Sequence, residues 1–146
     1  MDNEWDNIAQ EYSQIIIGDK GRLKHQSCIA PQIEIVIKDL SAGSKILDLG
    51  CGEGYICRLL DQRNFQIVGV DFSQQLIDIA KQKQTKAEFF LADLNQPINV
   101  GRDFDIVISN MVFMDVKNLK MAYQNAYNAL KQNGVLLLFI IHPVFA

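Results

Sequence analysis

Five short apolar runs, separated by segments with helical periodicity, set the pattern of this 146-residue chain. Several of the runs are nearly continuous in isoleucine, leucine, valine and phenylalanine, which is typical of strands buried on both faces of a sheet. Strands that alternate with helices favour a parallel sheet with right-handed crossovers and helices on both faces. We therefore predict a doubly wound α/β fold. Its expected strands are Lys45–Cys51, Gln66–Asp71, Ala87–Asp93, Phe104–Met111 and Val135–His142.

Helical patterns fill two of the segments between these runs. Ser73 is placed to cap a helix whose apolar positions include Leu76 and Ala80. A later helix has a longer apolar stripe, and Gly134 just beyond it is expected to act as its stop signal. The stripe consists of Leu119, Ala122, Tyr123, Ala126, Ala129 and Leu130.

Two more helices are expected ahead of the first strand. Their apolar faces hold Ile33, Val36, Ile37 and Leu40 in one, and Trp5, Ile8, Ala9 and Tyr12 in the other. The polar, glycine-bearing connector Gly18–Gln26 is expected to move or to fold over something. We therefore expect one domain, in which residues 1–44 form a cap and residues 45–146 form the core.

Composition and charge argue against several classes of protein. The net charge is −3 and the basic residues are scattered, which disfavours binding to nucleic acid or to a membrane surface. No apolar run reaches the roughly 18 residues of a spanning helix, and the acidic amino terminus is not a signal peptide. The three cysteines, Cys28, Cys51 and Cys57, form no CxxC pair. We expect no metal site and a reducing, cytoplasmic location.

Residues 45–71 carry the clearest functional signal. An apolar strand runs into a loop that contains Gly50, Gly52 and Gly54, and a helix and a second strand follow. Because glycine has no Cβ, this loop can bend tightly and touch a ligand. Its N–H groups and the helix dipole can face a carboxylate or a phosphate. Asp71, at the end of the second strand, is placed to accept hydrogen bonds from both ribose hydroxyls, which predicts a nucleoside-bearing cofactor.

Asp48 narrows the kind of cofactor. A carboxylate at the end of the first strand would repel a pyrophosphate but attract an ammonium or a sulfonium group. The dinucleotide motif G-x-G-x-x-G also fails, because position 55 holds Tyr55 and the shifted frame ends in the bulkier Cys57. These residues favour a cofactor that bears an amino acid. They leave a nicotinamide-dependent oxidoreductase as the weaker alternative.

Five segments together resemble the class I S-adenosylmethionine-dependent methyltransferases of the small-molecule type. ILDLGCGEGY resembles their first motif, VGVDFSQQLIDIA the second and FFLADLNQP the third. FDIVISNMVFMDV resembles the fourth, and ALKQNGVLLLFIIHPVF the helix and strand that follow. WDNIAQEY and the polar connector are similar to the family's cap segments. The resemblance implies a Rossmann-like sheet of five parallel strands in the order 3-2-1-4-5, preceded by cap helices.

The resemblance also implies roles for individual residues in holding S-adenosylmethionine, or its product S-adenosylhomocysteine. The loop Gly50, Cys51, Gly52 and Gly54 would touch the methionine and ribose portions, with Asp48 near the amino group. Asp71 would hold the ribose, Phe72 the adenine face, Asp93 and the Leu94 N–H the adenine edge, and Asn110 and Met111 the methionine arm. His25 would reach the cofactor carboxylate.

Each of these roles has a structural alternative that the sequence leaves open. Asp71 and Asp93 can cap turns, and Asn110 can simply end its strand. Phe72 can pack, and His25 can be a surface residue. Trp5 and Tyr12 are interpreted as helix-packing aromatics, with pocket walls as the alternative. His142 is interpreted as a strand-end residue, with a residue that faces the acceptor as the alternative. Cys51 is interpreted as a small packing residue of the loop and not as a nucleophile, because no basic partner adjoins it.

The resemblance implies transfer of a methyl group from the cofactor sulfonium to a small-molecule acceptor by in-line displacement. Orientation supplies much of the rate, and we identify no catalytic residue in the sequence. The family's sheet continues with a further helix and an antiparallel strand pair, so the chain is interpreted as truncated after the fifth strand. A homodimer through the surface left there is one expectation. A cofactor-binding module without activity of its own is the alternative function.

Overall fold

The computed structural model describes residues 4–18, 25–83 and 85–141, and these build a five-stranded parallel sheet. Its strands are β1 (Lys45–Leu49), β2 (Gln66–Asp71), β3 (Glu88–Leu91), β4 (Phe104–Asn110) and β5 (Leu130–Phe139). They lie in the order β3-β2-β1-β4-β5, and every neighbouring pair is parallel. The predicted α/β class and the strand order 3-2-1-4-5 are therefore confirmed.

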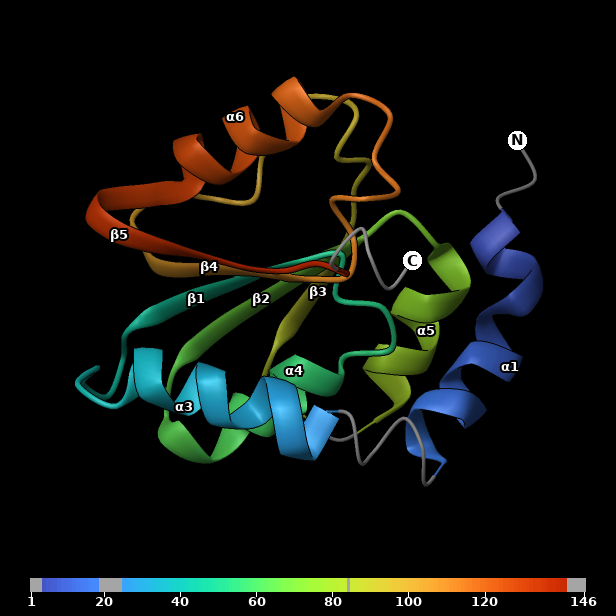
Figure 1. Ribbon diagram of the computed structural model, residues 1–146, viewed down its shortest axis with the longest axis horizontal. Coiled ribbons are helices and arrows are strands. Elements are labelled where there is room, and N and C mark those ends of the chain that lie inside the picture. The colour runs from blue at the N-terminus through green and yellow to red at the C-terminus, as the bar shows by residue number, and fades with distance from the viewer. Residues whose placement is uncertain (1–3, 19–24, 84, 142–146) are drawn as a thin grey trace.

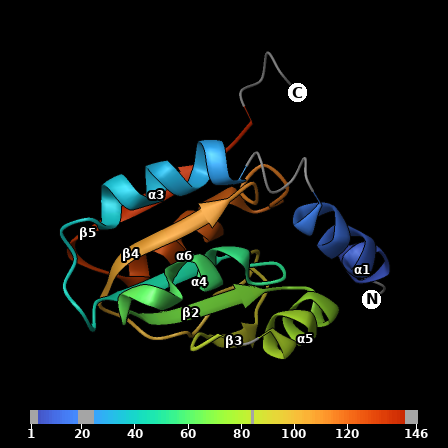
Figure 2. The ribbon, with the colours of Figure 1, turned by 90° about the horizontal axis from the view of Figure 1, so that it is seen from below.

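Helices cover both faces of the sheet (Figures 1 and 2). One face carries α3 (Ala30–Ile37), α4 (Tyr55–Leu60) and α5 (Gln74–Gln82), and the opposite face carries α6 (Leu119–Ala129). Helix α1 (Glu4–Ile17) lies against α5, on the side toward which the strands point. A π-helical turn η1 (His25–Ile29) precedes α3, and a 3-10 turn η2 (Asp61–Arg63) follows α4.

The two cores follow from the alternation of side chains along each strand. In β1, Ile46 joins the core under α3 and α4, whereas Leu47 and Leu49 join the core under α6. All three side chains are fully buried, and each burial contributes roughly 1.5–3 kcal/mol relative to exposure. The same alternation puts Asp48 on the face of Ile46, above α4. The core thus fixes on which face of the sheet this carboxylate lies.

Helix α5 begins where the sequence predicts. The Ser73 side chain accepts a hydrogen bond from the backbone N–H of Leu76 at 3.2 Å, which satisfies one of the unpaired donors of the first helical turn. Leu76 and Ala80 are both buried, and Ala80 belongs to the core on this face of the sheet. The N-cap therefore also fixes the path of the chain directly after β2.

The end of α6 and the start of β5 differ from the prediction. The helix ends at Ala129, so Gly134 is not its stop signal, and β5 begins at Leu130 instead of Val135. Pairing with β4 jumps from Phe104–Leu130 to Ile106–Val135, and the residues between them bulge out. Gly134 allows this bulge, because a Cβ there would lie 3.0 Å from the carbonyl oxygen of Phe104.

The apolar stripe predicted for α6 is only partly buried. Ala122, Ala126 and Ala129 pack against the sheet, but Leu119 and Tyr123 are each about half exposed. Small residues face the sheet because alanine lets the helix backbone approach it closely. Within the described part of the chain, no helix combines the length and the apolarity that crossing a membrane requires.

Candidate functional site

The glycine loop that follows β1 adopts left-handed backbone conformations at all three glycines. Gly50, Gly52 and Gly54 have φ values of +76°, +53° and +81°. A Cβ on Gly50 would lie 2.3 Å from Cγ2 of Val112, and one on Gly54 would lie 3.0 Å from the Phe89 ring. These two glycines therefore serve the packing of the loop against neighbouring elements. Gly52 faces a more open space, in which the nearest atom lies 3.8 Å away.

The backbone N–H groups of the loop are mostly used inside the protein. Those of Gly50 and Cys51 donate to the Val70 carbonyl at 2.8 and 2.9 Å, and that of Gly54 donates to Cys51. The N–H of Gly52 donates to Oδ2 of Asp71 at 2.9 Å. At these four positions the prediction that the loop N–H groups face a ligand is wrong. The reason is that β2 supplies the acceptors for three of them, and the Cys51 carbonyl inside the loop accepts from Gly54.

Asp71 ties the loop to the start of α5. Its Oδ1 accepts a hydrogen bond from the backbone N–H of Ser73 at 2.9 Å, while Oδ2 holds Gly52. The side chain is buried, and burial raises the pKa of this carboxyl, against the lowering effect of the backbone hydrogen bonds. A carboxylate oxygen has two lone pairs, so each oxygen keeps acceptor capacity for a further donor.

Asp48 and Asn110 present buried acceptor atoms that lack a partner. Among the described residues, neither Oδ1 of Asp48 nor Oδ1 of Asn110 has a hydrogen-bond donor. The other Asp48 oxygen accepts only a weak bond from the Cys57 thiol, at 3.6 Å. Asp48 is 1% exposed, and burial raises the pKa of its carboxyl to about 7. An unsatisfied buried acceptor costs about 1–3 kcal/mol, so two of them at one cavity mark a place for a donor-bearing ligand.

Both residues line one small cavity of about 30 Å³ at the carboxyl ends of β1 and β4. Five of the predicted cofactor residues therefore meet there, together with four residues that the prediction did not assign to the cofactor. The predicted ones are Asp48, Gly50, Cys51, Gly52 and Asn110. The additional ones are Tyr12, Glu53, Tyr55 and Ile56.

Tyr12 brings the cap helix α1 to the site. Its ring meets Trp5 edge to face, with ring centroids 5.3 Å apart, and it also borders the cavity beside Gly52. Burial, followed by the charges of Asp71 and Asp48, raises the pKa of the Tyr12 hydroxyl. Tyr12 therefore packs within its helix, as interpreted, and also forms a wall of the cavity, which was the alternative. The sequence signal was an aromatic residue on the apolar face of a helix ahead of the glycine loop.

Glu53, inside the glycine loop, is a buried charge with two cationic partners. Arg58 donates to both of its carboxylate oxygens, at 2.8 and 2.9 Å, and to its carbonyl oxygen at 2.6 Å. Lys83 at the end of α5 forms the second ion pair. Glu53 was not among the residues predicted for the site. Its signal was an acid five residues before Arg58, where α4 returns the guanidinium to the loop.

The predicted adenine residues lie on the neighbouring strand ends, outside the small cavity. Phe72 directly follows β2 and is about half exposed, and Leu94 is buried. Asp93 is exposed, and its Oδ1 accepts from the backbone N–H and the side-chain amide of Asn95 at 2.9 and 2.7 Å. Asp93 thus caps a turn here, while its carboxylate still faces solvent and can accept another donor.

Met111 and His25 are the remaining residues predicted to hold the cofactor. Met111 has a φ of +61°, and its backbone N–H donates to the carbonyl oxygen of Phe139, which links the end of β4 to β5. The backbone of His25 begins η1, but its side chain lies outside the described part of the structure, as does the whole of His142. Of the connector Gly18–Gln26, residues 19–24 also lie outside it.

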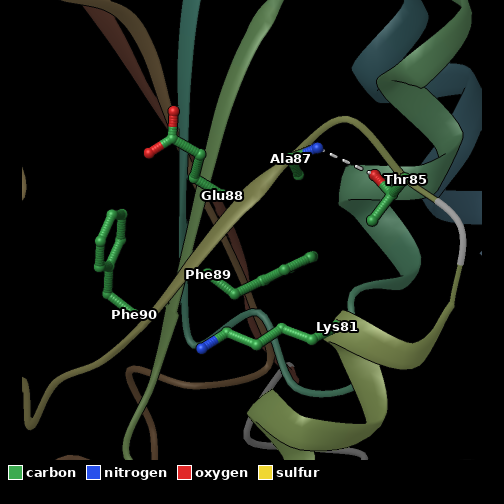
Figure 3. A pocket seen from close by; sticks show the side chains of 6 residues that line it. All are labelled: Lys81, Thr85, Ala87, Glu88, Phe89 and Phe90. Atoms are coloured by element: carbon green, nitrogen blue, oxygen red, sulfur yellow. Dashed lines mark hydrogen bonds between the residues drawn. The ribbon is translucent and has the colours of Figure 1, made fainter.

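A larger, shallow hollow lies elsewhere, along the edge strand β3 (Figure 3). Its polar groups do not converge on one point: Thr85 donates to Asp61 and accepts from the Ala87 N–H, while Lys81 and Glu88 are exposed. This hollow brings together no set of groups with evident chemistry. The small cavity at the carboxyl ends of the strands is therefore the candidate site, as is usual for open parallel sheets.

The fold defines a doubly wound protein with a Rossmann-like sheet, and comparison with known proteins identifies its family. The profile described as "Methyltransferase domain" matches residues 47–138. A malonyl-[acyl-carrier protein] O-methyltransferase of Serratia marcescens is 30% identical over 95 residues, which cover 65% of this chain and 37% of that enzyme. The chain thus spans well under half the length of this relative.

Solved structures agree with this assignment. A TehB-like SAM-dependent methyltransferase from Corynebacterium glutamicum is 27% identical, with a TM-score of 0.73 over 89% of this chain and 71% of that one. The PH0226 protein from Pyrococcus horikoshii, 24% identical, shares the fold with a TM-score of 0.77 over 88% of this chain and 58% of that one. The chain belongs to the class I S-adenosylmethionine-dependent methyltransferases, and S-adenosylmethionine is the cofactor of this family.

Proposed function

We propose that this chain binds S-adenosylmethionine at the cavity between β1, β4 and α1, and takes part in methyl transfer to a small-molecule acceptor. The observation that carries the proposal is the pair of unpartnered buried acceptors, Oδ1 of Asp48 and Oδ1 of Asn110. An α-ammonium group has three donors and one positive charge. It would satisfy both acceptors and compensate the carboxylate charge that burial otherwise penalises.

The remaining contacts are assigned along the same edge of the sheet. Asp71 would accept from the ribose hydroxyls while it continues to hold Gly52 and Ser73. Phe72 and Asp93, on adjacent strand ends, would meet the adenine face and its exocyclic amine. The Leu94 N–H would meet the adenine edge, and Met111 would lie beside the methionine arm. The cofactor supplies an electrophilic methyl group. This chain supplies orientation and exclusion of water, for which the wall made by the half-buried Tyr12 and the buried Ile56 is suited.

Calorimetric titration with S-adenosylhomocysteine and, separately, with NAD(H) tests the cofactor. We expect S-adenosylhomocysteine to bind and NAD(H) not to bind. Binding of NAD(H) alone would refute the proposal in favour of an oxidoreductase. Asn110→Leu keeps the size of the side chain but removes its acceptor, and should weaken S-adenosylhomocysteine about tenfold. Asn99→Leu, at an exposed position in the loop before β4, is the control and should leave the affinity unchanged.

Transfer of a labelled methyl group to a panel of metabolites tests the activity. Carboxylate acceptors belong in that panel, because a relative at 30% identity is named as a malonyl-[acyl-carrier protein] O-methyltransferase. Transfer to any member supports the enzyme. Cofactor binding without transfer across the panel favours a binding module. We propose no nucleic-acid or membrane partner, and a cytoplasmic location, in keeping with the free cysteines.

We also propose that the chain forms a homodimer through the edge strand β5. Its residues Val135–Phe139 have the composition of a doubly buried strand but are half-buried or exposed, unlike those of β4. Sedimentation velocity should show a dimer, and Val135→Lys should shift it to the monomer. A wild-type monomer at working concentration would rule this interface out.

A further inference from the structure

Helix α1 is fastened to α5 at two places. Oδ1 of Asp6 accepts hydrogen bonds from the Ser73 hydroxyl and from the Gln75 backbone N–H, at the start of α5. Further along α1, Oγ of Ser13 accepts a hydrogen bond from Nζ of Lys83 at 3.2 Å, at the other end of α5. Because the two contacts lie at opposite ends of α5, they fix both the position and the direction of α1.

Lys83 is also joined to the glycine loop. The same Nζ forms an ion pair with Glu53, whose side chain is 1% exposed. The Lys83 side chain is itself mostly buried, and burial lowers its pKa. A buried carboxylate requires its ionic partners, so this lysine is held in place from the side of the loop. Its remaining donor capacity is directed at Ser13, and one ammonium group therefore bridges the loop and the cap helix.

The bridge bears on the candidate site through the residue next to Ser13. Tyr12 forms the α1 wall of the cavity and lies beside Gly52. The cavity, of about 30 Å³, is far smaller than ligand pockets, which span about 300–1,000 Å³. The opposite walls belong to β1, β4, α4 and the glycine loop. The core holds the first three in place, and hydrogen bonds to Val70 and Asp71 hold the loop. The wall that can yield is therefore α1.

We propose that Lys83 is a positioning residue that latches α1 over the methionine end of the cofactor site, through Ser13 on one side and Glu53 on the other. This inference rests on the proposed cofactor site. In this proposal, α1 moves away from α5 to admit the cofactor and then docks again to retain the cofactor. Asp6 at the far end acts as the pivot, because its contacts are to the first turn of α5 and do not involve the cavity wall.

The sequence supplies a probe for this motion. Trp5 is the only tryptophan of the chain, and it lies in α1 against Tyr12. Quenching of its fluorescence by acrylamide, without any ligand, measures how often α1 undocks. Lys83→Met and Ser13→Ala should each raise the quenching constant several-fold. Lys83→Arg should restore most of the wild-type value, and Lys81→Met, an exposed lysine on the same helix, should change nothing.

Stopped-flow binding of S-adenosylhomocysteine supplies the second readout. Loss of a hydrogen bond from a charged donor should raise the dissociation rate about tenfold or more in Lys83→Met and in Ser13→Ala. If Lys83→Met does not fold, Ser13→Ala is the deciding variant, because it leaves the Lys83–Glu53 ion pair intact.

Unchanged Trp5 quenching in Ser13→Ala, with Lys83→Met unchanged or unfolded, would overturn the latch. If wild-type protein fails to bind S-adenosylhomocysteine while the variants still free Trp5, the latch on α1 stands and the proposed cofactor site fails. The two failures are thus separable.

Discussion

Asp71 accepts a hydrogen bond from the backbone N–H of Gly52 at 2.9 Å, so the acid at the end of β2 holds the glycine loop that follows β1. The contact joins two residues 19 positions apart. The other carboxylate oxygen of Asp71 accepts a hydrogen bond from the Ser73 N–H, at the cap of α5. One carboxylate therefore sets the relative positions of three elements that surround the site, in addition to the ribose-binding role that we propose for it.

This double role predicts two separable effects of changing Asp71. Asp71→Ala should weaken S-adenosylhomocysteine by about 1.5–3 kcal/mol, the scale of a hydrogen bond to a charged group, and should also lower the stability of the fold. Asp71→Asn keeps one acceptor oxygen and should lose less of both. Calorimetry measures the affinity for S-adenosylhomocysteine, and urea denaturation measures the free energy of unfolding. An unchanged affinity in Asp71→Ala would show that the ribose assignment is wrong.

How much of this could be predicted from sequence depends on whether the signal is periodic or spatial. The strands and their order follow from apolar runs and from family motifs, since burial on both faces leaves a one-dimensional trace. The link between Asp71 and Gly52 leaves no such trace, because it depends on where two separate strand ends meet. The same holds for Glu53 with Lys83 and for Tyr12 at the cavity. The bulge before Val135 was hidden because Gly134 fits a helix stop and a bulge equally well.

The close approach of Gly50 to Val112 gives a matched pair of glycine variants. Gly50→Ala should destabilise the protein by several kcal/mol, because its Cβ would lie 2.3 Å from Cγ2 of Val112 and its φ is +76°. Gly43→Ala shares the positive φ, at +85°, but its Cβ would meet open space. It should cost only about 1–2 kcal/mol. Thermal and urea unfolding measure both.

A double variant isolates the steric part of the Gly50 effect. Val112→Ala removes the two methyl groups nearest to the added Cβ, so Gly50→Ala combined with Val112→Ala should recover part of the lost stability. Strict additivity of the two single changes would contradict the proposed contact, since it would mean that the two side chains do not meet.

Two arginine ion pairs among the described residues should differ in their contribution to stability. Arg58 pairs in bidentate fashion with the buried Glu53, whereas Arg63 pairs with Glu34 where both side chains are nearly half exposed. Arg58→Met should cost about 2–3 kcal/mol, somewhat less than a fully buried pair because Arg58 reaches solvent and Lys83 remains. Arg63→Met should cost less than about 1 kcal/mol. If urea denaturation shows that both variants lose the same free energy of unfolding, the buried Glu53 pair contributes no more than the exposed pair, which would contradict this prediction.

The raised pKa of Asp48 predicts a pH dependence of both stability and binding. Burial raises this pKa to about 7 from 3.8, so between these values the folded state keeps a proton that the unfolded state has released. Stability should therefore fall as pH rises from about 4 to about 7, by up to roughly 4 kcal/mol, and should then level off. The variant Asp48→Asn has no such proton to release. The denaturation midpoint of this variant should therefore fall less than that of the wild type between about pH 4 and about pH 7.

Binding should follow the opposite trend. An ammonium-bearing ligand pairs with the ionised carboxylate, so the affinity for S-adenosylhomocysteine should rise as pH increases through about 7, as long as its amino group stays protonated. Calorimetry at pH 6 and pH 8 measures the change. Adenosine, which shares the nucleoside but has no ammonium group, should show no such rise. The same increase for both ligands would place the titrating group at the ribose end, near Asp71, and would contradict the ammonium role assigned to Asp48.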